Sequence, residues 1–167
     1  MKKIPLTQGK FALVDDEDYE WLMKWKWFAR KDERNFYAAR NQSKKNGETK
    51  NKKSRRLVSM HKVILKPRWN KLTDHIDGDG LNNQRDNLRS VTYSQNAMNR
   101  RKRKKTASSF KGVFSVSGYK GKKWIAKIRI NQKLKYLGIS SSEVFCARLY
   151  NEAAIKNFGE YARPNEI

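Results

Sequence analysis

The sequence predicts an α+β protein built from two small modules. Residues 71–99 indicate a polar hairpin that leads into a helix, and residues 110–159 indicate three short strands followed by a longer helix. An unbroken run of six cations at residues 100–105 stands between these two patterns. A chain of 167 residues is long enough for two such modules but too short for a large enzyme with a deep cleft.

The charge of the chain predicts a polyanionic partner. There are 39 Lys and Arg residues against 16 Asp and Glu residues, which gives a net charge of +23. Self-repulsion at this charge would destabilise the fold if no partner offset it. The cations are interleaved with asparagines and aromatic residues and form no long basic amphipathic helix, so nucleic acid fits better than a membrane surface.

The single cysteine excludes a disulfide framework within the chain and suits a reducing compartment, so we expect no disulfide-linked partner. The start of the chain lacks the sustained apolar run of an export signal, and no segment is apolar enough to span a membrane. We therefore expect a monomer that makes no membrane contact and works in the cytoplasm of a bacterium or a phage-infected host cell.

In the amino-terminal region, residues 4–14 alternate loosely and predict one short strand. Four acidic residues at 15–18 come next and fit the start of a helix, because the helix dipole stabilises negative charge there. Trp21, Leu22 and Trp25 recur at helical spacing and predict one buried face. A second metal site at the acidic residues is the alternative interpretation.

The following segments predict strand, basic loop and apolar element in turn. Residues 35–40 indicate a strand, and residues 42–56 indicate a basic loop that contacts phosphates or is simply solvated. Residues 57–65 predict a strand that passes into a short helix, stopped by Pro67. His61 lies among apolar neighbours, where a histidine is more often packed than catalytic.

The polar hairpin is predicted from two strands, at residues 71–76 and 88–91, joined by a loop at residues 77–87. A helix should follow, because Thr92 and Gln95 match a capping box. An EF-hand is excluded, since a leucine would stand where that loop needs a bidentate glutamate.

Asp74 and His75 give the hairpin its chemistry. They pair a hard oxygen ligand with an imidazole that can accept a proton near neutral pH, and the asparagines of the loop add neutral oxygens. Such a set of groups is typical of a hydrolytic site. The alternative is that these Asp, Asn and Gly residues only form turns.

This segment resembles the HNH endonucleases with a ββα-metal fold, especially the homing type encoded by phages and introns. The resemblance rests on several pieces in order, which are Asp74-His75, Asn82-Asn83, Asn87-Leu88-Arg89, Val91-Thr92, and Asn96 with Asn99 behind it.

The resemblance implies a role for each main residue. His75 is the general base that activates a water, and Asn87 braces the loop so that His75 is oriented. Asp74 and Asn96 hold one divalent metal, and their oxygen donors favour Mg²⁺ or Mn²⁺. His61 is expected to support the structure and not to bind the metal.

The basic run follows directly after the predicted active-site helix. We expect Arg100, Arg101, Lys102 and Arg103 to contact the DNA backbone. In a eukaryotic protein the same run would indicate a nuclear import signal. The run closes a nuclease module over residues 1–105, with its core at about 55–105, and a second module occupies residues 106–167.

The second module is predicted as a three-stranded antiparallel sheet packed on one helix. The strands fall at residues 111–116, 123–130 and 134–139, and the helix runs from Ser140, with Glu143 completing a capping box, to Gly159. The residues expected to pack between the middle strand and the helix are Trp124, Ala126, Ile128, Ile130, Phe145, Leu149, Ala153 and Ala154.

This module resembles the Apetala and ethylene-response-factor DNA-binding domains. The matching residues are Lys111-Gly112-Val113, Trp124-Ile125-Ala126-Lys127-Ile128, Tyr136-Leu137-Gly138, Ala153-Ala154, Phe158-Gly159 and Asn165. The resemblance implies a sheet that lies in the major groove and reads it with Lys111, Phe114, Lys127, Arg129 and Tyr136. Phe114 departs from the family pattern, in which arginine is usual.

Together these patterns predict a metal-dependent, site-selective endonuclease of the HNH type that acts on double-stranded DNA. A water activated by His75 hydrolyses the phosphodiester bond, and a homing role follows from the resemblance. The alternative is a sequence-specific DNA-binding regulator whose HNH segment is inactive. A basic RNA-binding protein is a further alternative.

Overall fold

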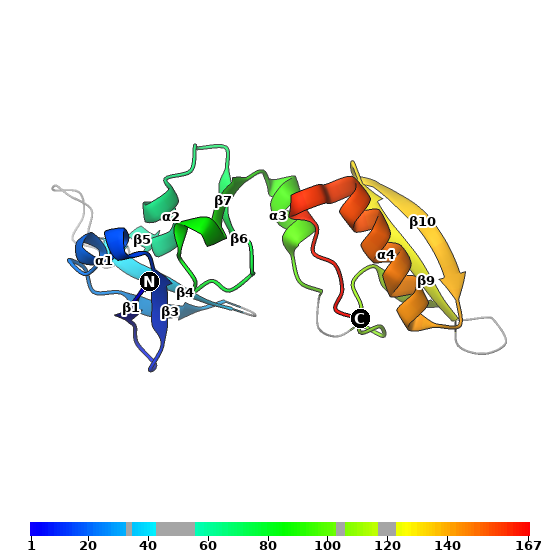
Figure 1. Cartoon of the computed structure of the whole chain (residues 1–167), viewed down its shortest axis with the longest axis horizontal. Helices are drawn as coiled ribbons and strands as arrows, with labels where there is room; N and C mark the ends of the chain where they lie inside the picture. Colours follow the sequence, from blue (N-terminus) through cyan, green and yellow to red (C-terminus); the bar gives the residue numbers. More distant parts are fainter. Residues whose placement is uncertain (33–34, 43–55, 103–105, 117–122) are drawn as a thin grey trace. The chain divides into compact units, whose positions relative to one another are not determined.

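The computed structural model describes residues 1–32, 35–42, 56–102, 106–116 and 123–167. The chain forms two compact units, Met1–Tyr93 and Ser94–Ile167. Both combine helices with small antiparallel sheets (Figure 1), so the protein is α+β. In the described part of the chain, no helix is both long and apolar enough to cross a bilayer.

The first unit holds most of the short elements. In chain order they are β1 (Lys2–Pro5), β2 (Phe11–Val14), α1 (Asp16–Leu22), β3 (Phe28–Lys31), β4 (Phe36–Gln42), β5 (Arg56–Ser59), α2 (Met60–Leu65), β6 (Leu72–His75), the 3-10 turn η2 (Arg85–Asn87) and β7 (Leu88–Val91). Three sheets result: a β1–β2 hairpin, a β3–β4–β5 sheet and a β6–β7 hairpin. The predicted strands at 35–40, 71–76 and 88–91 and the strand-to-helix passage at 57–65 are present.

The chain begins with a hairpin, whereas the sequence predicts one strand over residues 4–14. Strands β1 and β2 pair antiparallel, with Ile4 opposite Ala12. The turn between them places Gln8 at φ 63° and Gly9 at φ 64°. Because Gln8 is not a residue type that favours this left-handed conformation, the sequence gives little sign of the turn.

Helix α1 ends at Leu22, so the predicted face of Trp21, Leu22 and Trp25 is only partly formed. Leu22 is fully buried and Trp21 packs against the same core, but Trp25 lies beyond the helix and is 39% exposed. Trp27 is not part of the predicted face, yet it is buried where Trp25 is not. Its indole Nε1 donates to the carbonyl of Leu22. The basic segment predicted at 42–56 falls almost entirely at 43–55, outside the described residues.

The second unit is a three-stranded sheet with one long helix. Its elements after α3 (Tyr93–Asn99) are β8 (Val113–Val116), β9 (Lys123–Ile130), β10 (Lys133–Ser140), α4 (Glu143–Phe158) and the 3-10 turn η3 (Gly159–Tyr161). The strand order is β10–β9–β8, all antiparallel, and α4 lies across one face of the sheet (Figure 1). The predicted inward side of β9 is confirmed: Trp124, Ala126 and Ile128 are buried, and Ile130 packs beside them.

Two details of α4 differ from the prediction. Ser142, not Ser140, caps the helix by accepting from the amide of Phe145, while Glu143 accepts from Ser108 and Ser109. Phe145 is about half exposed and does not pack on the sheet, because the buried face of the helix runs through Cys146, Ala147, Tyr150, Ala154 and Phe158. The predicted end at Gly159 is confirmed.

The boundary between the compact units falls before residue 94, earlier than the predicted module boundary at 105. Most of α3 therefore belongs to the second unit. Met98 explains this, since it packs on the core formed by Ile128, Tyr150, Ala154 and Phe158.

Candidate active site

The β6–β7 hairpin presents Asp74 and His75 at the end of β6. Asp74 pairs with Arg89 and His75 pairs with Leu88 across the ladder. Both side chains are more than nine-tenths buried. A charged and a titratable group in such a place need compensating partners, and the hairpin supplies them.

Arg89 compensates the charge of Asp74. Its Nε and Nη2 lie 3.0 and 2.9 Å from the same carboxylate oxygen, Oδ2. Residues directly opposite in an antiparallel pair are close enough for this contact, so the ion pair follows from the register. A divalent metal at Asp74 must therefore compete with the Arg89 guanidinium.

Asn83 fixes the tautomer of His75. The Nδ2 of Asn83 donates to the carbonyl of Leu81 at 3.1 Å, which turns its Oδ1 toward His75 Nε2 at 3.3 Å. Because an amide oxygen only accepts, Nε2 must carry the proton, and Nδ1 is then the nitrogen with the basic lone pair. Asn83 is fully buried, so the contact is shielded from water.

The surroundings of His75 act on its pKa in two directions. Burial lowers the pKa below the usual histidine value and has the largest effect. The hydrogen bond with Asn83 and the charges of Asp77, Asp74 and Asp79 oppose it, because each favours the protonated ring. The ring is therefore neutral at neutral pH but sits in an acidic neighbourhood that stabilises the cation once a proton arrives.

His61 and Tyr37 form an aromatic wall around His75. The ring centroids of His61 and His75 are 5.1 Å apart and nearly perpendicular, and Tyr37 lies 5.9 Å from His75. Burial, with the nearby His75 and Lys62, lowers the pKa of His61 to about 3, so it stays neutral. Its Nδ1 is buried without a hydrogen-bond partner in the described structure.

Asn87 and Asp77 brace the loop between the two strands. Asn87 accepts from the amide of Asp77 at 3.0 Å and donates both to Asp77 Oδ1 at 3.0 Å and to the carbonyl of Asn82 at 2.8 Å. Burial alone would raise the pKa of Asp77, but the hydrogen bonds from Asp79, Asn82 and Asn87 outweigh it and lower the pKa. Asn87 thus spans the loop that follows His75.

The loop is also docked on the amino-terminal elements, which the sequence does not predict. Leu13 accepts from the amide of Asn83 at 2.8 Å and donates to the carbonyl of Leu81 at 2.9 Å. Gly80 fits against β4, where a Cβ would lie 2.5 Å from the carbonyl oxygen of Phe36. Leu13 therefore holds the main chain of Asn83, and β4 holds the loop just before it.

Arg85 also attaches the loop to the amino-terminal elements. Its contacts give a structural role to two of the acidic residues at 15–18. Its Nε and Nη2 reach the two oxygens of Asp18 at 2.8 Å each, and its amide donates to Asp15. Asp18 is fully buried and also accepts from Trp21. In this structure these acids therefore bind an arginine of the loop.

The predicted metal ligands lie in different compact units. Asp74 is in the first, whereas Asn96 is on the part of α3 that belongs to the second and is half-buried. Among the described residues, no group of three or more His, Cys, Asp or Glu side chains is arranged to hold a metal ion. The two side-chain oxygens match the donors that Mg²⁺ and Mn²⁺ prefer.

The predicted DNA contacts divide into two groups in the second unit. Lys127, Arg129 and Tyr136 lie on the sheet face away from α4, where Lys127 pairs with Tyr136. Phe114 is half exposed on the same face, opposite Ile125. Lys111 departs from this group, since its amine donates to the carbonyl of Met98.

The second group consists of the four consecutive cations at residues 100–103. Arg100, Arg101 and Lys102 line a hollow together with Lys111, whereas Arg103 lies outside the described residues.

Comparison with known protein families gives a match that includes the β6–β7 hairpin. Residues 67–98 match the HNH endonuclease family. Over 94 residues the chain is 39% identical to a protein of Acanthamoeba polyphaga mimivirus named as an uncharacterized HNH endonuclease, and the alignment covers 56% of this chain and 46% of that one. The chain thus spans about half the length of the curated relative it matches. No solved structure matches the chain.

The matched segment contains β6, the braced loop, β7 and most of α3. The sequence analysis assigns roles to Asp74, His75 and Asn87 in this segment. It assigns no role to Asn83 or Arg89, although both stand in the quoted motif, because their partners become visible only once the register of the hairpin is known.

Proposed function

We propose that this protein is a metal-dependent DNA endonuclease of the HNH type in which His75 is the general base. The observation that supports this most is the tautomer of His75. A neutral imidazole with Nε2 held by Asn83 is prepared to accept a proton on Nδ1, and it does so inside the segment that matches the HNH endonucleases.

The reaction proceeds from this arrangement. Nδ1 of His75 takes a proton from a water as its oxygen attacks the phosphorus, and the bond to the 3′ oxygen of the DNA breaks. Asp74 and its acidic neighbours stabilise the imidazolium that forms. Asp74 and Asn96 would hold the divalent metal, which when bound would stabilise negative charge on the phosphate and the departing oxygen.

Incubation with supercoiled plasmid tests the proposal. We expect cleavage with Mg²⁺ or Mn²⁺ and none with chelator. His75→Ala should abolish cleavage but keep DNA affinity, because a base that acts on water contributes little to substrate binding. Lys62→Ala is the matched control, since Lys62 is exposed on α2 near the same histidines. Cleavage by His75→Ala within about tenfold of the wild type would refute the assignment.

The main alternative is a DNA-binding regulator with an inactive nuclease segment. The Arg89–Asp74 ion pair favours it, because a guanidinium occupies an oxygen of the proposed metal ligand. The plasmid assay separates the two functions: a regulator binds the plasmid under every condition and leaves it supercoiled.

The second unit is proposed to give the enzyme its site selectivity as an Apetala-type DNA-binding domain. The mixed face of Lys127, Arg129, Tyr136 and Phe114 supports this, since it offers cations and apolar contacts on one sheet surface. A monomer acting on double-stranded DNA in the cytoplasm, with a homing role, completes the proposal. Selection of cleaved sites from a random duplex library tests the selectivity.

A further inference from the structure

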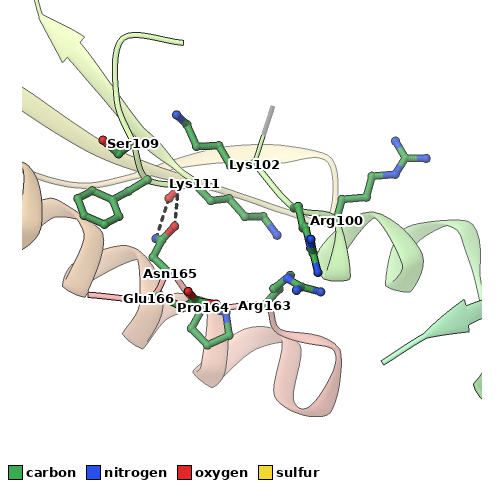
Figure 2. A pocket seen from close by; sticks show the side chains of 10 residues that line it. Arg100, Lys102, Ser109, Lys111, Arg163, Pro164, Asn165 and Glu166 are labelled. Carbon is green, nitrogen blue, oxygen red and sulfur yellow. Dashed lines mark hydrogen bonds between the residues drawn. The ribbon is translucent and has the colours of Figure 1, made fainter. Parts of the chain in front are cut away.

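The second unit contains a cationic hollow that the proposed cleavage step does not use. Its volume is about 470 Å³. The charged residues of its described lining are Arg100, Arg101, Lys102, Lys111, Arg163 and Glu166. Figure 2 shows Lys111 and Arg163 extending toward one another from two separate segments. Five cations against one acid give the hollow an excess of positive charge that favours an anion.

Asn165 holds the two segments together. Its Oδ1 accepts from the amide of Lys111 at 2.6 Å, and its Nδ2 donates to the carbonyl of Lys111 at 3.1 Å (Figure 2). Asn151 of α4 in turn bonds the main chain of Asn165 on both sides, at 2.7 and 2.9 Å. Because Arg163 stands only two residues before Asn165, this clamp keeps Arg163 beside Lys111.

Gly112 allows Lys111 to lie this deep. Its φ of 78° is rare for residues with a side chain, and a Cβ there would overlap the ring of Tyr150. The Lys111 amine then reaches the carbonyl of Met98 at 2.6 Å and lies 6.0 Å from the centre of the Tyr150 ring. The lysine is thus fixed along its whole length.

This placement brings two like charges together in a half-buried space. Burial and then the charge of Arg163 lower the pKa of Lys111 to about 8. An anion between the two cations would relieve both effects, because it replaces lost hydration and cancels the repulsion. Arginine supplies a planar fork for phosphate oxygens, and lysine adds a point charge.

We propose that this hollow binds one backbone phosphate of duplex DNA, with Lys111 and Arg163 as its direct ligands. The inference rests on the proposed function, which makes DNA the substrate. Arg100 and Lys102 also line the hollow, and we assign them to neighbouring phosphates. Because a phosphate carries no base identity, the hollow adds affinity and register, whereas selectivity stays with the sheet face of Lys127 and Arg129.

The test measures affinity of the full chain for duplex DNA by fluorescence anisotropy, in chelator so that no cleavage occurs. Lys111→Met keeps the length of the side chain, and Arg163→Gln keeps its polarity. Each should weaken binding by about tenfold on target and random duplexes alike, and lower the slope of log affinity against log salt by about one. Lys111→Arg should restore most of the affinity.

Lys156→Ala is the control, because it removes one exposed cation from the same unit. Thermal unfolding followed by circular dichroism shows that each variant is folded. The inference is overturned if the wild type binds duplex DNA but Lys111→Met and Arg163→Gln lose no more affinity than Lys156→Ala does. That result leaves the proposed function standing. A wild type that does not bind duplex DNA overturns both, as does preference for single-stranded RNA. Millimolar inorganic phosphate should compete only weakly, since it lacks the neighbouring contacts.

Discussion

Arg89 binds Asp74 through two nitrogens on a single carboxylate oxygen, at 3.0 and 2.9 Å. The pair joins β6 and β7 at the residue proposed to hold the metal. The guanidinium therefore stabilises the hairpin and would compete with the proposed metal for the same oxygen.

Removing the guanidinium should separate these two effects. Arg89→Ala leaves a carboxylate that is 8% exposed without its main partner, and we expect a loss of about 3 kcal/mol in unfolding free energy. Chemical denaturation measures it. The double variant Asp74→Asn with Arg89→Ala should recover much of the loss, because no charge is then left buried. Equal losses in the single and double variants would contradict this account.

Asn83→Asp should raise the pKa of His75, since a carboxylate next to Nε2 favours the protonated ring. The proposed base must be neutral, so we expect cleavage above the His75 pKa and its loss as pH falls through that value. In the wild type that pKa is lowered, and activity should persist below the pH at which an ordinary histidine protonates. In Asn83→Asp the acid limb should move to higher pH.

Proton NMR of the two histidine rings provides the measurement. His61, with a pKa of about 3, should stay neutral over the same range and acts as an internal reference. An unchanged His75 titration in Asn83→Asp would mean that Asn83 does not set the protonation of the base.

Arg85→Ala should loosen the loop that holds Asn83. Asp18 is fully buried and would lose a fork of two hydrogen bonds, although the exposed half of the arginine limits the effect to about 1 to 3 kcal/mol of stability. We expect faster hydrogen exchange at the amide of Asn83 and a lower cleavage rate. Asp86→Ala, at an exposed neighbour, is the control. Exchange that stays at the wild-type rate would show that the contacts of Leu13 suffice.

Arg129→Ala should cost selectivity more than general affinity. Arg129 is exposed on the sheet face opposite α4, so a contact with a base edge is worth about 1 to 3 kcal/mol on the target and much less on random DNA. Competition between target and random duplexes measures the difference. Lys133→Ala, at the exposed start of β10, is the comparison. Equal losses on both duplexes would assign Arg129 to the backbone.

DNA binding should weaken as pH rises past about 8, because phosphate favours protonated Lys111. The groups that surround its amine are Arg163, Tyr150, the Met98 carbonyl and, across the hollow, Arg100, Arg101, Lys102 and Glu166. Tyr150 has a pKa raised to about 12 by burial and does not titrate in this range. Anisotropy between about pH 7 and about pH 9 should show the loss in the wild type but not in Lys111→Met. A parallel decline in both would assign the pH dependence to other groups.

Local patterns predict the strands and the helix of the second unit, and they predict β4, β6 and β7 of the first. Alternation along β9 marks its buried side, and Gly159 marks the end of α4 through its positive φ. The motif residues Asp74, His75 and Asn87 also lie within one hairpin, where their order along the chain nearly fixes their neighbours.

What sequence reasoning misses depends on contacts between distant residues. Asp18 and Arg85 are 67 positions apart, and nothing local to either announces the other. The same holds for Met98, whose packing against Tyr150 and Phe158 draws α3 into the second unit. The helix cap is a smaller case: Ser140 and Ser142 are both suitable capping residues, and the sheet decides between them because β10 extends through Ser140.

The docking of the loop on Leu13, Asp15 and Asp18 limits how the segment that matches the HNH endonuclease family can be moved between proteins. The family match covers residues 67–98, whereas these three supports lie outside it. A graft of the matched segment alone would carry His75 and Asn83 but leave Asn83 without its main-chain clamp and Arg85 without its carboxylates. A segment that is to be grafted must therefore include residues 11–18, or the host protein must supply a strand and carboxylates that make the same contacts.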